Sequence, residues 1–362
     1  MLPTMQDSLY FHRPDYAAKL VNSLKDGITH AFTLFAPRRM GKTQFLLQDI
    51  TPLAEKQGFN VFYFSFMDSA NPAADFQAAL TQFSANIQTG GKAKTFISGI
   101  SKIDILGVGF ERQTSPTPQY RLSELIGAIA ADNRPSLLLL DEVQELARTK
   151  NTSHLIKSLR TGMDINQARV KTIFTGSSTN GLRAMFNDHK APFFHFAHAL
   201  DFPLLGHEFT DFLAAIYQER TNQRIDGADL YALFERLNHT PMYLRAIVQD
   251  MILNPALSLE EAAAYRMAEI KNQYNGIGQW QQLKPLERIL LHDIAHNSEI
   301  SPYSQESRSR YAALLGIEKI GSSSIQAAIK SMTRQELISR NTQDGLIISN
   351  PLFQTWIVEN TD

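Results

Sequence analysis

The sequence predicts an α/β protein with a parallel sheet in its first half and helical regions after it. Three observations predict this class. Over residues 1–205, short apolar segments alternate with segments of helical spacing, a pattern typical of a parallel sheet covered on both faces. Residues 206–280 show helical spacing almost throughout. Residues 281–362 add two short apolar segments around an Asp-Gly pair, which favours a hairpin turn.

The expected strands of the sheet are short, apolar and β-prone. They are 31–35, 60–66, 136–142, 170–178 and 199–204. Helical spacing over 44–50, 73–84 and 120–131 supplies covering helices between them. Residues 88–118 differ, because they are rich in Gly, Ser, Lys and Thr and alternate in polarity over 102–110. We interpret them as an inserted loop or hairpin.

The second half of the chain is expected to be helical before it closes with a ribbon. The first helices are predicted at 208–221, 229–237, 242–253 and 259–270. The last region adds helices at 286–296, 307–315 and 323–335, followed by strands at 337–340 and 346–348. Three helices and a two-stranded ribbon are typical of a winged helix. For a chain of 362 residues, two or three domains are expected. We therefore predict an α/β core (1–205), a helical lid (206–280) and a winged helix (281–362).

Composition narrows the classes of function. The net charge of -1 gives no general attraction to nucleic acid or membrane, so any nucleic-acid site has to be a local patch. The chain contains no cysteine, which excludes disulfides, thiol nucleophiles and thiolate metal sites and fits a reducing compartment. No secretory signal and no apolar stretch of membrane-spanning length is visible. We expect a cytoplasmic protein without a membrane partner.

The first predicted strand is followed by a near match to a phosphate-binding loop. Residues 36–43 read A-P-R-R-M-G-K-T against the pattern G-x-x-x-x-G-K-[ST], so Ala36 replaces the first glycine. The strand before the loop and the helix after it favour the motif over a chance Gly-Lys-Thr at a helix start. In such a loop, backbone N–H groups hold phosphates, the lysine contacts the β- and γ-phosphate oxygens, and the hydroxyl binds Mg²⁺. The residues assigned to nucleotide binding here are Pro37, Arg38, Arg39, Met40, Gly41, Lys42, Thr43 and Gln44. Arg38 and Arg39 could contact phosphate or a neighbouring subunit, and a solvated loop face is an equal alternative for both.

Polar residues end two later strands of the predicted sheet, where open parallel sheets bind ligands. Asp141 and Glu142 follow four leucines, and Ser177 or Ser178 ends the next strand. Asp141 suits a metal site with Thr43, and Glu142 suits polarising an attacking water. Ser177 would hold that water or a phosphate. A helix N-cap is the alternative for the two acids, and their combination with the loop favours a catalytic site.

The order of these motifs resembles the archaeal-type ATPases of the AAA+/STAND group. A-P-R-R-M-G-K-T, L-L-L-L-D-E-V-Q and T-I-F-T-G-S-S are followed by the predicted lid and winged helix, so the resemblance runs from about Phe11 to Trp356. It implies ATP and Mg²⁺ as cofactors. It also implies a Walker A motif at Gly41, Lys42 and Thr43, a Walker B motif at Asp141 and Glu142, and sensor 1 at Ser177.

The resemblance has two weaker points in the second half of the chain. His239 and Pro241 match a sensor 2 region that would lie near adenine, but the glycine of that pattern is replaced. Related proteins often carry an arginine finger before the last core strand, and residues 191–198 contain no arginine. Arg183 and Arg245 are fallback candidates. Because a finger contributes ~10³–10⁵ in rate where present, turnover without one should be slow or depend on a partner.

These observations predict an ATP-hydrolysing switch in which ATP and Mg²⁺ rearrange the lid and the winged helix for a DNA or protein partner, or for a second copy of the chain. One alternative is a nucleotide-dependent binding module with little hydrolysis. Another is a small-molecule kinase, which would need neither the acid pair nor the winged helix. DNA contact would involve basic residues of the last region, although acidic residues lie among them. The basic residues are Arg308, Arg310, Lys319, Lys330, Arg334 and Arg340, and the acidic ones are Glu306, Glu318 and Glu336.

Overall fold

The computed structural model describes most of the chain as two compact units. The described residues are 7–67, 71–88, 95–98, 121–148, 152–177, 185–186, 193–273, 276–297, 300–340 and 345–361. The first compact unit, unit 1, ends at Ala256, and unit 2 begins at Leu257. Unit 1 thus joins the sheet to the helices that follow it. The predicted domain boundaries at 205 and 280 stay predictions.

Unit 1 contains a six-stranded parallel sheet with the order β3-β2-β4-β5-β1-β6. The strands are β1 (Ala31–Phe35), β2 (Asn60–Ser65), β3 (Thr95–Ser98), β4 (Ser136–Asp141), β5 (Val170–Gly176) and β6 (His198–Asp201). The five predicted strands are therefore confirmed. Buried residues fill β1, β2, β4 and β5 almost without interruption, as expected for parallel strands covered on both faces.

The edge strand β3 lies within the stretch interpreted as an inserted loop or hairpin. It pairs parallel to β2, with Phe62 opposite Phe96 in the register. The rings of these two residues stack with their centres 5.6 Å apart. Burial of Phe96 therefore explains why this short segment joins the sheet. The alternating segment 102–110 lies outside the described residues.

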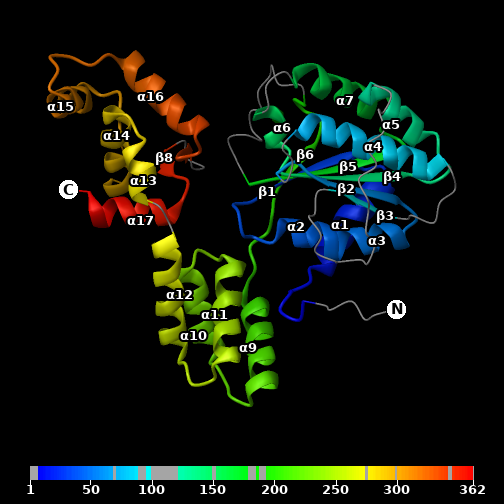
Figure 1. Cartoon of the computed structure of the whole chain (residues 1–362), viewed down its shortest axis with the longest axis horizontal. Coiled ribbons are helices and arrows are strands. Elements are labelled where there is room, and N and C mark those ends of the chain that lie inside the picture. The colour runs from blue at the N-terminus through cyan, green and yellow to red at the C-terminus, as the bar shows by residue number, and fades with distance from the viewer. Residues whose placement is uncertain are drawn as a thin grey trace. The chain divides into compact units, whose positions relative to one another are not determined.

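Helices cover both faces of the sheet (Figure 1). On one face lie α1 (Pro14–Lys25), α2 (Lys42–Phe45), the π-helical turn η1 (Leu46–Ile50) and α3 (Thr51–Lys56). On the other face lie α4 (Pro72–Gln88), α5 (Leu122–Ala130), α6 (Gln144–Arg148) and α7 (Ser153–Ile165). Each face buries its own apolar core. The residues Leu20, Phe45 and Tyr63 belong to the first core, and Phe62, Phe76 and Leu159 belong to the second.

Unit 1 continues into helices α9 (His207–Thr221), α10 (Gly227–Arg236) and α11 (Pro241–Leu253), as predicted. Figure 1 shows these helices side by side. Buried Phe209, Leu233, Phe234 and Ile247 come from their apolar faces. Pro241 is the first residue of α11, where its fixed φ suits a helix start.

Unit 2 buries a separate apolar core between its helices and a two-stranded ribbon. Its elements are α12 (Leu259–Gln273), α13 (Gly276–Gln281), α14 (Pro285–His296), α15 (Gln305–Leu315), α16 (Ser322–Arg334), β7 (Ile338–Arg340), β8 (Leu346–Ile348) and α17 (Pro351–Asn360). The strands β7 and β8 pair antiparallel, as the Asp-Gly pair predicted. Gly276 begins α13.

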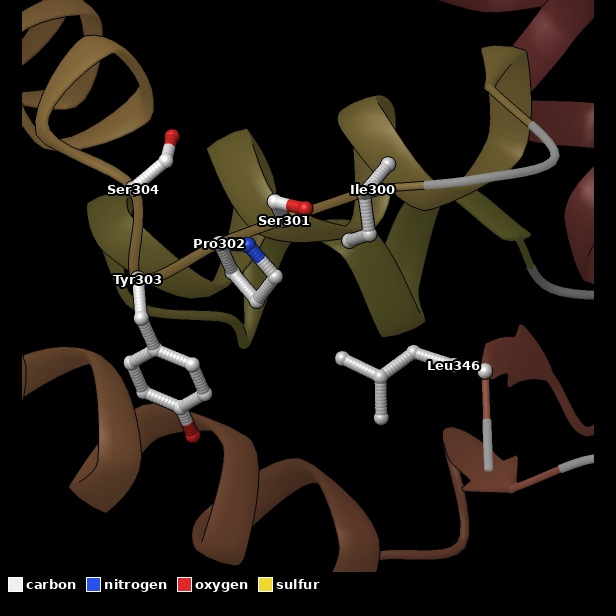
Figure 2. Close-up of a pocket in the computed structure, with 7 residues that line it drawn as sticks. Ile300, Ser301, Pro302, Tyr303, Ser304 and Leu346 are labelled. Atoms are coloured by element: carbon white, nitrogen blue, oxygen red, sulfur yellow. The ribbon is translucent and has the colours of Figure 1, made fainter. Parts of the chain in front are cut away.

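A pocket of about 360 Å³ lies in unit 2, between the chain that precedes α15 and the start of β8. Figure 2 shows Tyr303 on one side of this pocket and Leu346 on the other, with Pro302 between them. The described residues that line it carry no charged side chain. In the described part of the chain, no helix combines the length and apolar character needed to cross a membrane.

Candidate functional site

The loop after β1 has the backbone conformation of a tight turn into a helix. Gly41 is the N-cap of α2 and has a left-handed φ of 88°. Arg39 is also left-handed, with a φ of 72°. Ala36 is not among the residues of positive φ, so the position that departs from the motif does not need glycine. The left-handed turns that the loop requires occur at Arg39 and Gly41 instead.

Lys42 lies at the start of α2 and is buried, with 4% of its surface exposed. Its ammonium donates hydrogen bonds of 2.8 Å and 2.9 Å to the carbonyl oxygens of Ala36 and Pro37. Burial lowers the pKa of Lys42, and the charges of Glu142 and Asp141 oppose that shift. The loop thus holds a desolvated cation beside two acids.

Asp141 ends β4 and is only 2% exposed. The Thr43 hydroxyl donates to it over 2.6 Å, Tyr63 of β2 donates over 3.1 Å, and Thr175 of β5 donates as well. Burial raises the pKa of this carboxyl, and the hydrogen bonds from Thr175 and Thr43 oppose the rise. Asp141 is therefore fixed from the loop and from both strands that flank β4.

Glu142 follows directly and is 8% exposed. It has a left-handed φ of 54°, which is uncommon for a residue with a side chain. One carboxylate oxygen accepts hydrogen bonds from Ser177 N at 3.1 Å, from Ser177 Oγ at 2.7 Å and from the amide of Gln144. Arg38 Nε lies 3.5 Å from the same Ser177 hydroxyl. The predicted residues Glu142, Ser177 and Arg38 therefore form one connected group.

Three side chains around the acids were not identified from the sequence. Tyr63 and Thr175 lie on strands that neighbour β4, and Gln144 begins α6. The Oε1 atom of Gln144 is buried without a partner among the described residues. A polar residue at the end of the apolar strand β5 was a visible signal for Thr175. Tyr63 gave no such signal, because tyrosine is common in buried strands.

The remaining predicted binding residues are spread around this group. Met40 is buried in the core that packs on α1 and α2, whereas Pro37 is exposed and Gln44 is half-buried. His239 contacts α10, since its ring centre lies 5.0 Å from that of Phe234, and its Nδ1 is buried without a partner in the described part of the structure. Pro241 is buried at the start of α11. The predicted roles of His239 and Pro241 at adenine stay predictions.

Of the two fallback candidates for an arginine finger, the structure describes one. Arg183 lies outside the described residues. Arg245 of α11 forms an ion pair of 2.5 Å with Asp7. The aromatic residues Phe193 and Phe196 are buried in the core. Among the described residues, no group of three or more His, Cys, Asp or Glu side chains is placed to hold a metal.

The six-stranded parallel sheet, with this loop after β1 and this acid pair at the end of β4, has counterparts in solved structures. No protein-family profile and no curated protein matches the sequence. The Walker-type ATPase of Pyrococcus abyssi matches the structure with a TM-score of 0.64 at 17% identity, over 99% of each chain. The ORC2 protein of Aeropyrum pernix, in its ADPNP–ADP complexes, matches with a TM-score of 0.57 at 16% identity, over 98% of this chain and 97% of that one. The chain therefore has the fold of the archaeal-type AAA+ ATPases, as the sequence predicted.

Proposed function

We propose that this protein binds ATP with Mg²⁺ and hydrolyses it, and that the state of the nucleotide changes the lid helices α9–α11 and unit 2. The convergence of a buried ammonium, a hydroxyl and two carboxylates supports this proposal most directly. Lys42 and Thr43 begin α2, directly after the loop that follows β1, and Asp141 and Glu142 come from the end of β4. Hydrogen bonds join Thr43 to Asp141 and Glu142 to Ser177.

The chemistry of these donors fits a nucleotide with a magnesium ion. The oxygen atoms of Thr43 and Asp141 lie 2.6 Å apart, and hard oxygen ligands are those that Mg²⁺ prefers. In nucleotide sites Mg²⁺ usually takes only one or two protein ligands and completes its shell with water and phosphate, so a larger acidic cluster is not required. Bound there, the ion would neutralise negative charge on the phosphate oxygens.

Each residue has a separate part in this proposal. Lys42 would exchange the carbonyl oxygens of Ala36 and Pro37 for phosphate oxygens, which are stronger acceptors for an ammonium. Glu142 would orient a water and accept its proton. Its three hydrogen-bond donors hold the carboxylate in one position. Its left-handed backbone is a local strain of the kind that clusters at active sites.

The test is a pair of variants with matched controls. Lys42→Ala should abolish ATP binding measured by calorimetry, whereas Lys171→Ala should not. Lys171 is a matched control because it is also a buried lysine, and its Nζ also donates to a backbone carbonyl, that of Gln167. Glu142→Gln should retain binding and lower phosphate release by ~10²–10⁴-fold, whereas Glu145→Gln should leave it unchanged. ATP binding retained in Lys42→Ala would contradict the proposal.

A nucleotide-dependent binding module with little hydrolysis is the second candidate. One observation favours it: Arg245, the finger candidate in the described part of the chain, is paired with Asp7. Two comparisons of the rate of phosphate release separate the two candidates. The first compares a low protein concentration with increasing concentrations, and the second compares the rate with and without added DNA. Slow release that no addition accelerates would support the binding module, because a finger from a second copy would act in a concentration-dependent way.

We propose that residues 281–362 of unit 2 form a winged helix and that DNA is one partner of it. The helix α16 buries Ile325 and Ile329 against the unit 2 core and exposes Lys330 and Arg334. Exposed basic side chains on one helix suit phosphate contacts, which position a protein on DNA. If DNA binds there, the double variant Lys330→Ala/Arg334→Ala should weaken the binding of a labelled duplex, and the weakening should shrink as salt increases. Equal affinity of the variant would leave a protein partner as the explanation of this surface.

A further inference from the structure

We infer that Arg39 and Tyr243 form a latch that holds the lid helix α11 on the phosphate-binding loop and opens when Arg39 turns to phosphate. This inference rests on the proposed nucleotide site and concerns its regulation. It assigns Tyr243, for which the sequence predicted no role, as the resting partner of a loop arginine. Tyr243 is the third residue of α11, directly after the Pro241 and Met242 of that helix start.

The contact between the two residues uses both parts of the tyrosine. The guanidinium carbon of Arg39 lies 5.0 Å from the centre of the Tyr243 ring, within the range of a cation–π interaction. Arg39 Nη1 also donates a hydrogen bond to the Tyr243 hydroxyl. These residues are 204 positions apart in the chain. One pair of side chains therefore connects the nucleotide loop with the lid.

The backbone of Arg39 adopts a conformation that is unusual for a residue with a side chain. Its φ of 72° lies in the left-handed region that residues with a side chain seldom adopt. Two positions further on, Gly41 is left-handed as well. A loop with two left-handed residues presents successive groups on one side, where an anion can bind. Arg39 thus belongs to the loop proposed to bind phosphate and also contacts the lid.

Phosphate is the stronger partner for this arginine. A guanidinium forms paired hydrogen bonds with the negatively charged oxygens of a phosphate, whereas the Tyr243 hydroxyl is a single, neutral acceptor. The side chain of Arg39 is exposed, so little packing has to be broken for it to move. Arg39 would then exchange Tyr243 for the nucleotide, and the start of α11 would lose its contact with the loop.

Another set of contacts keeps the lid attached when the latch opens. Phe11 lies edge-on to Phe209 and Phe212 of α9, with ring centres 5.8 Å and 5.3 Å apart. These apolar contacts do not involve the loop. The ion pair between Asp7 and Arg245 is partly exposed, and such pairs contribute little. We therefore expect α9 to stay on the core as a hinge while the start of α11 moves.

Hydrogen exchange followed by mass spectrometry tests the latch in the full chain. In wild-type protein, ATP with Mg²⁺ should raise amide exchange in the first turns of α11 severalfold and leave α9 unchanged. Arg39→Ala and Tyr243→Ala should show the faster exchange without nucleotide. Arg39→Lys keeps the charge but loses the fork, and should be intermediate. Tyr231→Ala is the control, because Tyr231 stacks on His207 within the lid and not on the loop.

The affinity for ATP is a second measurement, and it would not change if the contact between Arg39 and Tyr243 were purely structural. Tyr243→Ala should bind ATP more tightly than wild type, because the competing partner of Arg39 is gone. Arg39→Ala should bind at least about tenfold more weakly, as expected for the loss of a hydrogen bond to a charged group. If α11 exchanges equally in the wild type and in both alanine variants without nucleotide, the latch is refuted. If the wild type binds no ATP, the proposed function fails together with phosphate sensing, while the nucleotide-free comparison still decides whether the contact holds the lid.

Discussion

The Thr43 hydroxyl donates a hydrogen bond of 2.6 Å to Asp141, although 98 positions separate the two residues in the chain. The strand β1, which precedes the loop before Thr43, and the strand β4, which ends at Asp141, are not neighbours, because β5 lies between them in the sheet. The start of α2 therefore reaches across the end of β5, where Thr175 donates to the same carboxylate. This arrangement depends on the order of the strands, and it makes Asp141 the point at which three segments of the site meet.

The first prediction concerns the Thr43 hydroxyl. If Thr43 and Asp141 hold Mg²⁺, Thr43→Ala should remove most of the gain in ATP affinity that Mg²⁺ produces, since one oxygen ligand is lost. Thr43→Ser keeps the hydroxyl and should behave like the wild type. Calorimetry in Mg²⁺ and in EDTA measures the ratio of affinities for each protein. A Thr43→Ala variant with the wild-type ratio would exclude this residue as a ligand.

The second prediction concerns the pH dependence of stability without Mg²⁺. Burial raises the pKa of Asp141 above its ordinary value of 3.8, so the folded protein keeps this proton at pH values where the unfolded chain has lost it. The contribution of Asp141 to stability should therefore decrease as the pH rises from about 3.8 through the raised pKa. Asparagine does not titrate, and the stability of Asp141→Asn relative to wild type should increase over that range. Urea unfolding in EDTA at several pH values measures this difference, and a difference that stays constant over the range would contradict the prediction.

The third prediction separates backbone strain from steric clash in the loop. A Cβ atom added at Gly41 would meet nothing within 4 Å, but the φ of +88° is unfavourable for any side chain. Gly41→Ala should therefore lower the free energy of unfolding by about 1–2 kcal/mol through strain alone. Gly127 also has open space and lies inside α5 with no positive φ. Because alanine is favoured in helices by about 1 kcal/mol, Gly127→Ala should be neutral or stabilising in the same unfolding assay. Equal losses in the two variants would contradict the strain argument.

The parts of the site that local spacing encodes were predicted from the sequence. Lys42 and Thr43 follow a β-prone segment and begin a helix, and Asp141 and Glu142 follow an apolar strand, so their positions at strand ends could be deduced. Thr175 at the end of β5 gave the same kind of signal, but Tyr63 could not be deduced in this way. Tyr63 reaches Asp141 only because β2 and β4 are neighbours, and neighbouring strands are a result of the fold.

The same limit applies to the fold. The strand β3 depends on pairing with β2 and on burial of Phe96, and its polar surroundings gave no local signal for it. The helices α1 and α7 were not predicted, although their buried residues recur with helical spacing. Those two omissions are failures of interpretation, because the pattern was present. The left-handed turn at Arg39 and its contact with α11 had no visible signal, since arginine has no preference for that conformation.

The fourth prediction concerns Asp49, a carboxylate on η1 that is 8% exposed. It accepts hydrogen bonds from the Tyr10 hydroxyl at 2.7 Å and from the Arg13 N–H at 3.1 Å, and His12 Nδ1 lies 2.6 Å away. Arg13 in turn donates to the carbonyl of Met40 in the loop. One side chain thus anchors the N-terminal segment beside the site.

Replacing Asp49 by alanine would leave these donors without their acceptor, at a cost of about 1–3 kcal/mol in the free energy of unfolding. Asp49→Asn keeps one acceptor oxygen and should lose less. Glu219→Ala, at an exposed position of α9, should change stability by no more than about 0.5 kcal/mol. If the anchor also positions Phe11 against α9, limited proteolysis should cleave Asp49→Ala near residues 7–13 faster than wild type. Unchanged cleavage together with the expected loss of stability would show that Asp49 supports the core alone and does not hold the segment that reaches the lid.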